Sequence, residues 1–219
     1  MPKITAVPFP LDIEVGSTAL VIIDMQQDFV LPGGFGEALG NDTSLLLAAV
    51  EPTARVLTAA RNAGMFVVHT REGHRPDLSD CPPAKLTRVG QTFIGEKGPM
   101  GRILVRGEKG HEIVPRLAPI AGEPVIDKPG KGAFHATDLG QVLATRGIKT
   151  LVVCGVTLEV AVHSTVREAN DRGYECVVLR DCVASYFPEF YRVGLDMITA
   201  QGALFGWVSD SESFVDAVD

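Results

Sequence analysis

Short, continuous apolar runs recur along the chain, and segments in which apolar residues repeat at helical spacing separate them. Runs of this length are typical of strands that a parallel sheet buries on both faces. They predict six strands, at residues 19–23, 65–68, 124–126, 151–154, 176–179 and about 204–208. Because strands and helices alternate, we expect a three-layer α/β/α sandwich of the Rossmann type, with a mostly parallel sheet of about six strands and right-handed crossovers.

Helical spacing predicts the elements between these strands, and several of them stop at a glycine. One helix is expected between Asn41-Asp42-Thr43 and Gly64, in two pieces if Pro52 interrupts it. Further helices are expected at about 137–146, at 158–172, from Pro188 to Gln201, and as a short piece at the C-terminal end.

Residues 70–110 show no clear periodicity and are rich in glycine, proline and charged residues. Loops of this length are uncommon in compact domains and are often functional. The segment nevertheless carries the apolar residues Leu86, Val89, Phe93, Ile94, Ile103, Leu104 and Val105. We therefore expect a lid or subunit-contact segment that packs, rather than a low-complexity linker, within a single domain spanning residues 1–219.

Composition and charge narrow the class of protein. The chain has 219 residues, 46% of them hydrophobic, and a net charge of −7, which disfavours nucleic-acid and anionic-membrane partners. No apolar run is as long as a membrane span, and the first residues lack the apolar core of a signal peptide. The four cysteines are scattered without CxxC pairs, so neither a disulfide framework nor a zinc site is expected. These features predict a cytoplasmic protein.

Candidate chemistry falls where three predicted strands end. Asp24 follows the first strand, Lys128 follows the third, and the turn at 155–161 lies between a strand and a helix. The carboxyl ends of parallel strands meet at one edge of a sheet, where ligands bind. An acid, a base and a nucleophile turn at one edge is typical of a hydrolytic site.

The motifs at these positions carry a family resemblance. They are Asp-Met-Gln-Gln-Asp-Phe at 24–29, Gly-Ala-Phe-His-Ala-Thr-Asp-Leu at 132–139 behind Lys128, and Gly-Val-Thr-Leu-Glu-Val-Ala-Val-His-Ser-Thr at 155–165. In this order they resemble the isochorismatase-like hydrolases, from about Ala19 to Trp207. The stretches Pro-Gly-Lys-Gly-Ala-Phe at 129–134 and Val-Arg-Glu-Ala-Asn-Asp-Arg-Gly-Tyr at 166–174 look closest to the biuret and triuret amidohydrolases.

The resemblance implies a mechanism that uses an Asp, a Lys and a Cys, and no cofactor or metal. A Cys thiolate attacks a small ureido amide, ammonia leaves, and water cleaves the thioester. By motif position, residue 161 is the nucleophile, and Asp24 takes the thiol proton and returns it to the leaving amine. Lys128 keeps Asp24 ionised and favours the thiolate. The backbone at Val156 and Thr157 forms the oxyanion turn, and the resemblance implies a cis peptide bond between these two residues.

Two positions depart from the family pattern. The nucleophile position holds Ala161, which has no ionisable proton, and Leu158 stands where relatives commonly carry a threonine. Three interpretations follow. The chain is an amidohydrolase inactivated at the nucleophile but able to bind its substrate. Alternatively it is a natural Cys-less hydrolase that cleaves a vinyl ether with Asp24 as general acid, as true isochorismatases do, or it is a non-catalytic binding protein.

Other residues are candidates for the pocket. Lys131 is expected to contact substrate carbonyls, Leu158 to line the first contact layer, and Phe29 and Phe35 to wall the pocket unless they belong to the core. Gln201 is expected either as a buried amide that reads a ureido group or as a helix cap.

The remaining expectations concern metal and assembly. His69 and His74, with Glu72 and Asp77, suggest a metal site, but the nicotinamidase pattern is not clearly reproduced, so hydrogen bonding within the loop is favoured. The resemblance also implies a homo-oligomer, a tetramer.

Overall fold

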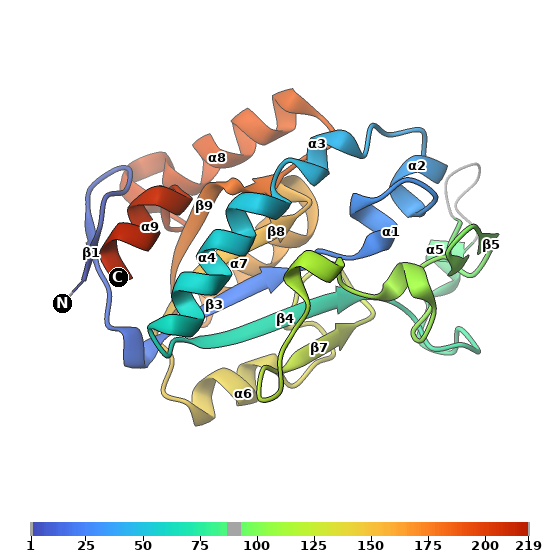
Figure 1. The fold of residues 1–219 in the computed structure, drawn as a ribbon, viewed down its shortest axis with the longest axis horizontal. Helices are drawn as coiled ribbons and strands as arrows, with labels where there is room; N and C mark the ends of the chain where they lie inside the picture. Colours follow the sequence, from blue (N-terminus) through green and yellow to red (C-terminus); the bar gives the residue numbers. More distant parts are fainter. Residues whose placement is uncertain (1, 87–92, 219) are drawn as a thin grey trace.

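A computed structural model describes residues 2–86 and 93–218. Its centre is a six-stranded sheet in the order β10-β9-β8-β3-β4-β7, in which every neighbouring pair is parallel (Figure 1). The strands are β3 (Thr18–Ile23), β4 (Phe66–Glu72), β7 (Val125–Lys128), β8 (Thr150–Val156), β9 (Glu175–Ala184) and β10 (Trp207–Ser209). The predicted fold class is therefore confirmed.

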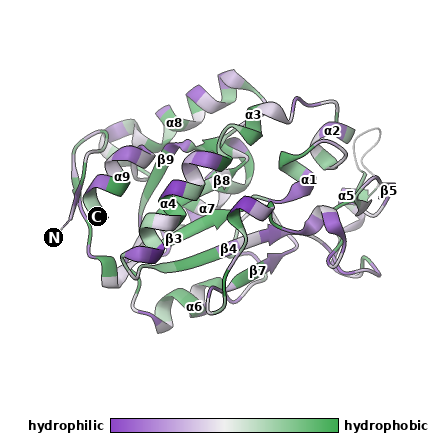
Figure 2. Ribbon diagram, in the orientation of Figure 1, coloured by the Kyte–Doolittle hydropathy of each residue, from purple (hydrophilic) through white to green (hydrophobic). Residues whose placement is uncertain are grey.

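Alternate strand residues face opposite sides of the sheet and enter two separate apolar layers. In β3, Leu20 and Ile22 pack on one side, while Val21 packs on the other. The first side is covered by α3 (Ser44–Leu47), α4 (Val50–Asn62) and α9 (Ser211–Val218). The second is covered by α6 (Leu139–Thr145), α7 (His163–Asp171) and α8 (Pro188–Ala203). Figure 2 shows the hydrophobic colour concentrated on the central strands and on the inward sides of the helices.

The structure corrects several predicted boundaries. β4 continues to Glu72 because Thr70, Arg71 and Glu72 pair with β7, although this polar stretch lacks the apolar signal of a strand. The first helix does break into α3 and α4, but the break precedes Pro52. Pro52 lies in the first turn of α4, where its missing N–H group leaves no helical hydrogen bond unmade.

The helix predicted at 158–172 begins with a π-helical turn, η4 (Leu158–Val162), which continues directly into α7. At the other end of the second layer, α8 is interrupted at Ala200, Gln201 and Gly202, whose backbone angles are not helical. Both irregularities matter for the site, because they set the direction in which predicted site residues point.

The described part of the 70–110 segment is packed. It contains α5 (Pro83–Leu86), a hairpin of β5 (Lys97–Gly98) and β6 (Gly101–Arg102), and the turn η2 (Lys109–His111). Ile103 and Leu104 join the apolar layer under α4, while Val89 falls outside the described residues. The predicted packing of Ile103 and Leu104 is confirmed, and the role of the segment as a lid stays a prediction.

The remaining elements are short. They are β1 (Lys3–Ile4), β2 (Leu11–Asp12), η1 (Val15–Ser17), α1 (Gln27–Val30), α2 (Phe35–Ala38) and η3 (Pro115–Leu117). The β1–β2 hairpin lies beside α9, so the two ends of the chain are neighbours (Figure 1). None of the helices in the described part of the chain is long and apolar enough to cross a lipid bilayer.

Candidate active site

The site forms where the strand order changes direction. After β3 the chain adds β4 and β7 on one side, and then returns to place β8 on the other side of β3. A crevice at the carboxyl ends of the strands is expected at such a switch point. Asp24 follows β3, the turn at 155–161 follows β8, and Lys128 ends β7, so the structure brings the three predicted strand ends to one edge.

Asp24 and Lys128 form a buried ion pair. Asp24 Oδ2 lies 2.7 Å from Lys128 Nζ, and the side chains are 1% and 0% exposed. The hydroxyl of Thr70 donates to Asp24 Oδ1 at 2.6 Å, and Lys128 also donates to the carbonyl of Gly130 at 2.9 Å. Burial raises the pKa of Asp24, and the charge of Lys128 opposes that rise. A carboxylate oxygen has two lone pairs, so Asp24 Oδ2 can accept from a ligand N–H group as well as pairing with Lys128.

A second carboxylate, Glu72, stands behind this pair. It lies at the end of β4, with Lys131 at 2.7 Å, Lys85 at 3.4 Å and Lys128 at 3.7 Å from its oxygens. Although burial alone would raise the pKa of Glu72, the lysines hold it below its ordinary value. Sequence reasoning did not place Glu72 here because the polar end of β4 was not recognised as a strand, which hid its position at a strand end.

A pocket of about 340 Å³ opens in front of these groups, a size suited to a small molecule. Phe29 and Phe35 line it and contact each other edge to face, with ring centroids 5.9 Å apart. The hydroxyl of Tyr186 donates to the carbonyl of Phe29 at 2.6 Å and fixes that wall. The other lining residues are Asp24, Leu39, Asn41, Glu72, Lys131, Val156, Thr157, Glu159, Val160, Ala161 and Phe187.

The turn after β8 completes the pocket. The peptide bond between Val156 and Thr157 is cis, as the resemblance implied. Ala161 lies on η4, is 3% exposed and lines the pocket, so residue 161 presents only a methyl group there. Its carbonyl accepts a hydrogen bond from the Thr165 hydroxyl at 2.8 Å. Gly155 has φ of +120°, and a Cβ there would lie 2.0 Å from the carbonyl oxygen of Ile23, so only glycine lets β8 approach β3 this closely.

Two predicted site residues lie elsewhere. Leu158 is fully buried in the apolar layer and packs against Gly194, because the π-helical turn directs it away from the pocket. Gln201 is exposed at the interruption of α8, so the expected buried amide is absent from this position. Cys154 is fully buried in β8 on the side covered by α4, and burial raises the pKa of its thiol well above the ordinary value, so it is not placed to act as a nucleophile in the pocket.

The histidines that suggested a metal have other partners. His69 is buried against Glu123 at 2.9 Å, and His74 lies 3.3 Å from Asp80. In residues 2–86 and 93–218, no group of three or more His, Cys, Asp or Glu residues is arranged to hold a metal ion.

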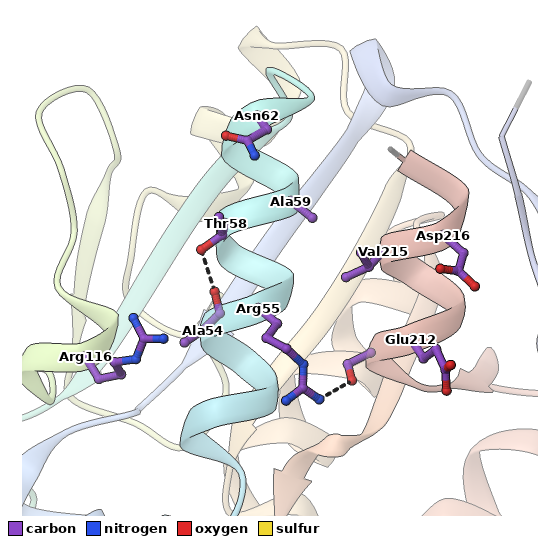
Figure 3. Close-up of a pocket in the computed structure, with 10 residues that line it drawn as sticks. Ala54, Arg55, Thr58, Ala59, Asn62, Arg116, Glu212, Val215 and Asp216 are labelled. Carbon is purple, nitrogen blue, oxygen red and sulfur yellow. Dashed lines mark hydrogen bonds between the residues drawn. The ribbon is translucent and has the colours of Figure 1, made fainter.

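A larger cavity lies away from the strand ends. It has a volume of about 530 Å³ and forms between α4 and α9 (Figure 3). Arg55 from α4 donates to the Ser211 hydroxyl of α9 at 3.2 Å across it, and Arg116 pairs with the exposed Glu51. Its polar groups serve helix packing and surface ion pairs, so the smaller pocket is the candidate active site.

Comparisons with known proteins identify relatives of this chain. The family described as the isochorismatase domain matches residues 18–213. A cysteine hydrolase from Pseudomonas syringae pv. phaseolicola 1448A is similar in structure, with 27% identity, a TM-score of 0.80, and coverage of 100% of this chain and 97% of that one.

Two further solved structures are similar. An isochorismatase family protein from Desulfovibrio vulgaris subsp. vulgaris str. Hildenborough has 30% identity and a TM-score of 0.76, with 91% and 97% of the two chains covered. N-carbamoylsarcosine amidase from Thermoplasma acidophilum has 25% identity and a TM-score of 0.69, with 90% and 97% covered. With the strand-end crevice, the buried Asp24–Lys128 pair and the family match in agreement, this chain belongs to the isochorismatase-like hydrolase family.

Proposed function

We propose that this chain binds a small ureido amide of the biuret or triuret type in the pocket beside Asp24, and that it does not form an acyl-enzyme. The observation that carries the proposal is the intact Asp24–Lys128 pair facing a pocket in which Ala161 supplies only a methyl group. The acid, the lysine and the turn are retained, whereas the atom that would form the covalent bond is missing.

Charge and shape support an uncharged planar ligand. The pocket is lined by the carboxylates of Asp24, Glu72 and Glu159, against the single amine of Lys131 with Lys128 beneath. This balance disfavours a dianion, because the lysines at the described pocket, Lys131 and Lys128, are already paired with Glu72 and Asp24. The aromatic side chains on the wall suit the flat faces of a ureido group, and one similar structure bears the name of an amidase that acts on a carbamoyl compound.

The consequence of Ala161 follows from the chemistry of acylation. In a Cys-bearing site, sulfur bonds to the amide carbon, the thiol proton passes to Asp24, and Asp24 returns it to the nitrogen that leaves as ammonia. Ala161 has no sulfur and no proton to give, so the first bond does not form. Asp24 is then left to accept a hydrogen bond from the bound amide.

The test restores the nucleophile. Biuret binding to the unmodified chain is measured by calorimetry, and the Ala161→Cys variant is assayed for ammonia release and for an acyl adduct by intact mass. We expect binding without an adduct for the unmodified chain, and turnover with an adduct for the variant. The matched control is Ala161→Ser, because the serine side chain is similar in volume to cysteine but its hydroxyl is a poorer nucleophile than a thiol. If Ala161→Cys releases ammonia from no ureido amide, the amidohydrolase ancestry of the pocket is refuted, and binding alone then favours a non-catalytic binding protein.

One observation favours a second candidate function. The raised pKa of Asp24 is a property of a general acid, which a Cys-independent vinyl-ether hydrolase requires. The carboxylates of Glu72 and Glu159 oppose this candidate, because its substrates are dicarboxylates. Steady release of pyruvate from isochorismate by the unmodified chain would replace the first proposal with this one.

The homotetramer stays a prediction that sedimentation analysis tests.

A further inference from the structure

Glu159 has a buried carboxylate oxygen that accepts no hydrogen bond from the described residues of the pocket. The residue lies on η4, two positions before Ala161, and lines the pocket together with Tyr186. The residue as a whole is half-buried, but its Oε2 atom is buried and has no hydrogen-bond partner among the residues that the structure describes. By contrast, Asp24 and Glu72, the other carboxylates of the pocket, are each held by a lysine.

Donors that line a cavity with Glu159 have other partners, among them Arg167, whose guanidinium donates to Met197 Sδ at 3.8 Å. The Tyr186 hydroxyl donates to the carbonyl of Phe29 at 2.6 Å. On the other side, His163 Nε2 lies 2.9 Å from the carbonyl of Gly194 and is engaged there. Within residues 2–86 and 93–218, no lysine, arginine or histidine forms an ion pair with Glu159.

A buried carboxylate oxygen without a partner is costly, because it has lost water without gaining a protein donor. Such groups are rare in folded proteins and call for a specific reason. Here the oxygen belongs to a residue on the wall of a ligand pocket, so a donor that arrives with the ligand removes the cost.

We infer that Glu159 selects the ligand by accepting hydrogen bonds from a terminal –NH₂ group, either a carbamoyl amide or an amidinium, at the part of the ligand that Asp24 does not contact. The inference rests on the proposed function and adds its substrate class. A ureido amide has an –NH₂ group at each end, which provides one donor set for Asp24 and another for Glu159. A ligand with a carboxylate at that end meets like charge and is rejected.

The first readout needs no ligand. Glu159→Gln removes the uncompensated charge, so the free protein is expected to melt a few degrees higher than the unmodified chain. Glu175→Gln is the matched control, since Glu175 is an exposed glutamate at the amino end of β9, on the opposite edge of the sheet. An unchanged or lower melting temperature for Glu159→Gln would show that the carboxylate has a partner in the free protein, and would overturn the inference.

The second readout is affinity, measured by calorimetry with three probes. These are biuret, its analogue with a terminal amidinium, and N-carbamoylglycine, which has a carboxylate at one end. Glu159→Gln is expected to weaken biuret about tenfold or more, because a charge-assisted hydrogen bond becomes a neutral one. If Glu159→Gln weakens binding of the amidinium probe more than binding of biuret, Glu159 prefers a cationic terminus. If it weakens binding of biuret more, Glu159 prefers a carbamoyl terminus. The unmodified chain is expected to bind N-carbamoylglycine more weakly than biuret.

The outcomes separate the two proposals. If the unmodified chain binds biuret and Glu159→Gln binds every probe with the same affinity, this inference fails and the proposed function stands. If the unmodified chain binds none of the –NH₂ probes, the proposed function itself fails and this inference falls with it. If Glu159→Gln changes the sedimenting mass without changing affinity, the carboxylate pairs with another copy of the chain, which also overturns the inference.

Discussion

Removing the charge of Lys128 should expose how much stability the buried pair holds. In Lys128→Met, Asp24 keeps the Thr70 hydroxyl but loses its ion pair with Lys128, while Glu72 retains Lys131 and Lys85. Breaking a buried pair by removing one partner typically costs about 3–5 kcal/mol. For a chain of this length, that loss lowers the melting temperature by roughly 6–20 °C.

The pH dependence of Lys128→Met follows from the sign of the pKa shift. Burial already raises the pKa of Asp24, and without Lys128 the nearby charge of Glu72 raises it further. The folded variant then binds a proton at a pH where the unfolded chain has released it. Its stability therefore falls as pH rises from the unfolded pKa of Asp24 toward the raised folded pKa. The deficit relative to the unmodified chain should therefore shrink as pH is lowered toward the unfolded pKa of Asp24.

The assay is urea unfolding of four proteins. They are the unmodified chain, the single variants Lys128→Met and Asp24→Asn, and the double variant Asp24→Asn/Lys128→Met. The double variant buries no uncompensated charge at this position, so its loss should be smaller than the sum of the two single losses by about 2 kcal/mol or more. The reasoning is refuted if Lys128→Met loses less than about 1 kcal/mol, or if the two losses simply add.

Two further predictions concern the fold around the site. Gly155→Ala should lower the free energy of unfolding in urea by about 3 kcal/mol or more, because the added Cβ would lie 2.0 Å from the Ile23 carbonyl oxygen. The control Gly64→Ala, also at positive φ but in open space, should lower it by only about 1 kcal/mol. Equal losses would contradict the close approach of Gly155 to Ile23. His111 is buried 3.6 Å from Asp127, and burial lowers its pKa to about 4. Between pH 6.5 and pH 4 the unfolded chain therefore binds a proton at this histidine that the folded chain does not bind. Roughly 3 kcal/mol of stability should be lost as pH falls through that range. His111→Leu should flatten that part of the stability curve, and an unchanged slope would assign the acid sensitivity to other groups.

Much of the fold was predictable because its signals are local. The central strands are continuous apolar runs, and Asp24, Lys128 and Ala161 follow such runs directly or by one turn. The parallel arrangement then brings these strand ends together whatever the details of the loops. Phe29, expected either as a pocket wall or as a core residue, lines the pocket and also packs in the apolar layer.

The rest depended on information that local patterns do not carry. Glu72 reaches the site because β7 pairs with the polar end of β4, a contact between distant segments. Leu158 was predicted in the pocket, and Gln201 either there or as a helix cap, but a π-helical turn buries Leu158 in the apolar layer and an interruption of α8 leaves Gln201 exposed. Glu159 carries a different lesson, since only the inventory of hydrogen-bond partners reveals that one of its oxygens is unpaired.

The buried Asp24–Lys128 pair also bears on how this chain can change over generations. Each partner is needed to keep the other from standing as an uncompensated charge, so selection for folding alone preserves both residues. Their presence is therefore not a record of continuing catalysis. Residue 161, which we propose as the nucleophile position, has no such protection, because Ala161 is a small side chain at the pocket wall. Under that proposal, a change at residue 161 leaves the acid and the lysine in place, and the acylation chemistry stands one substitution away.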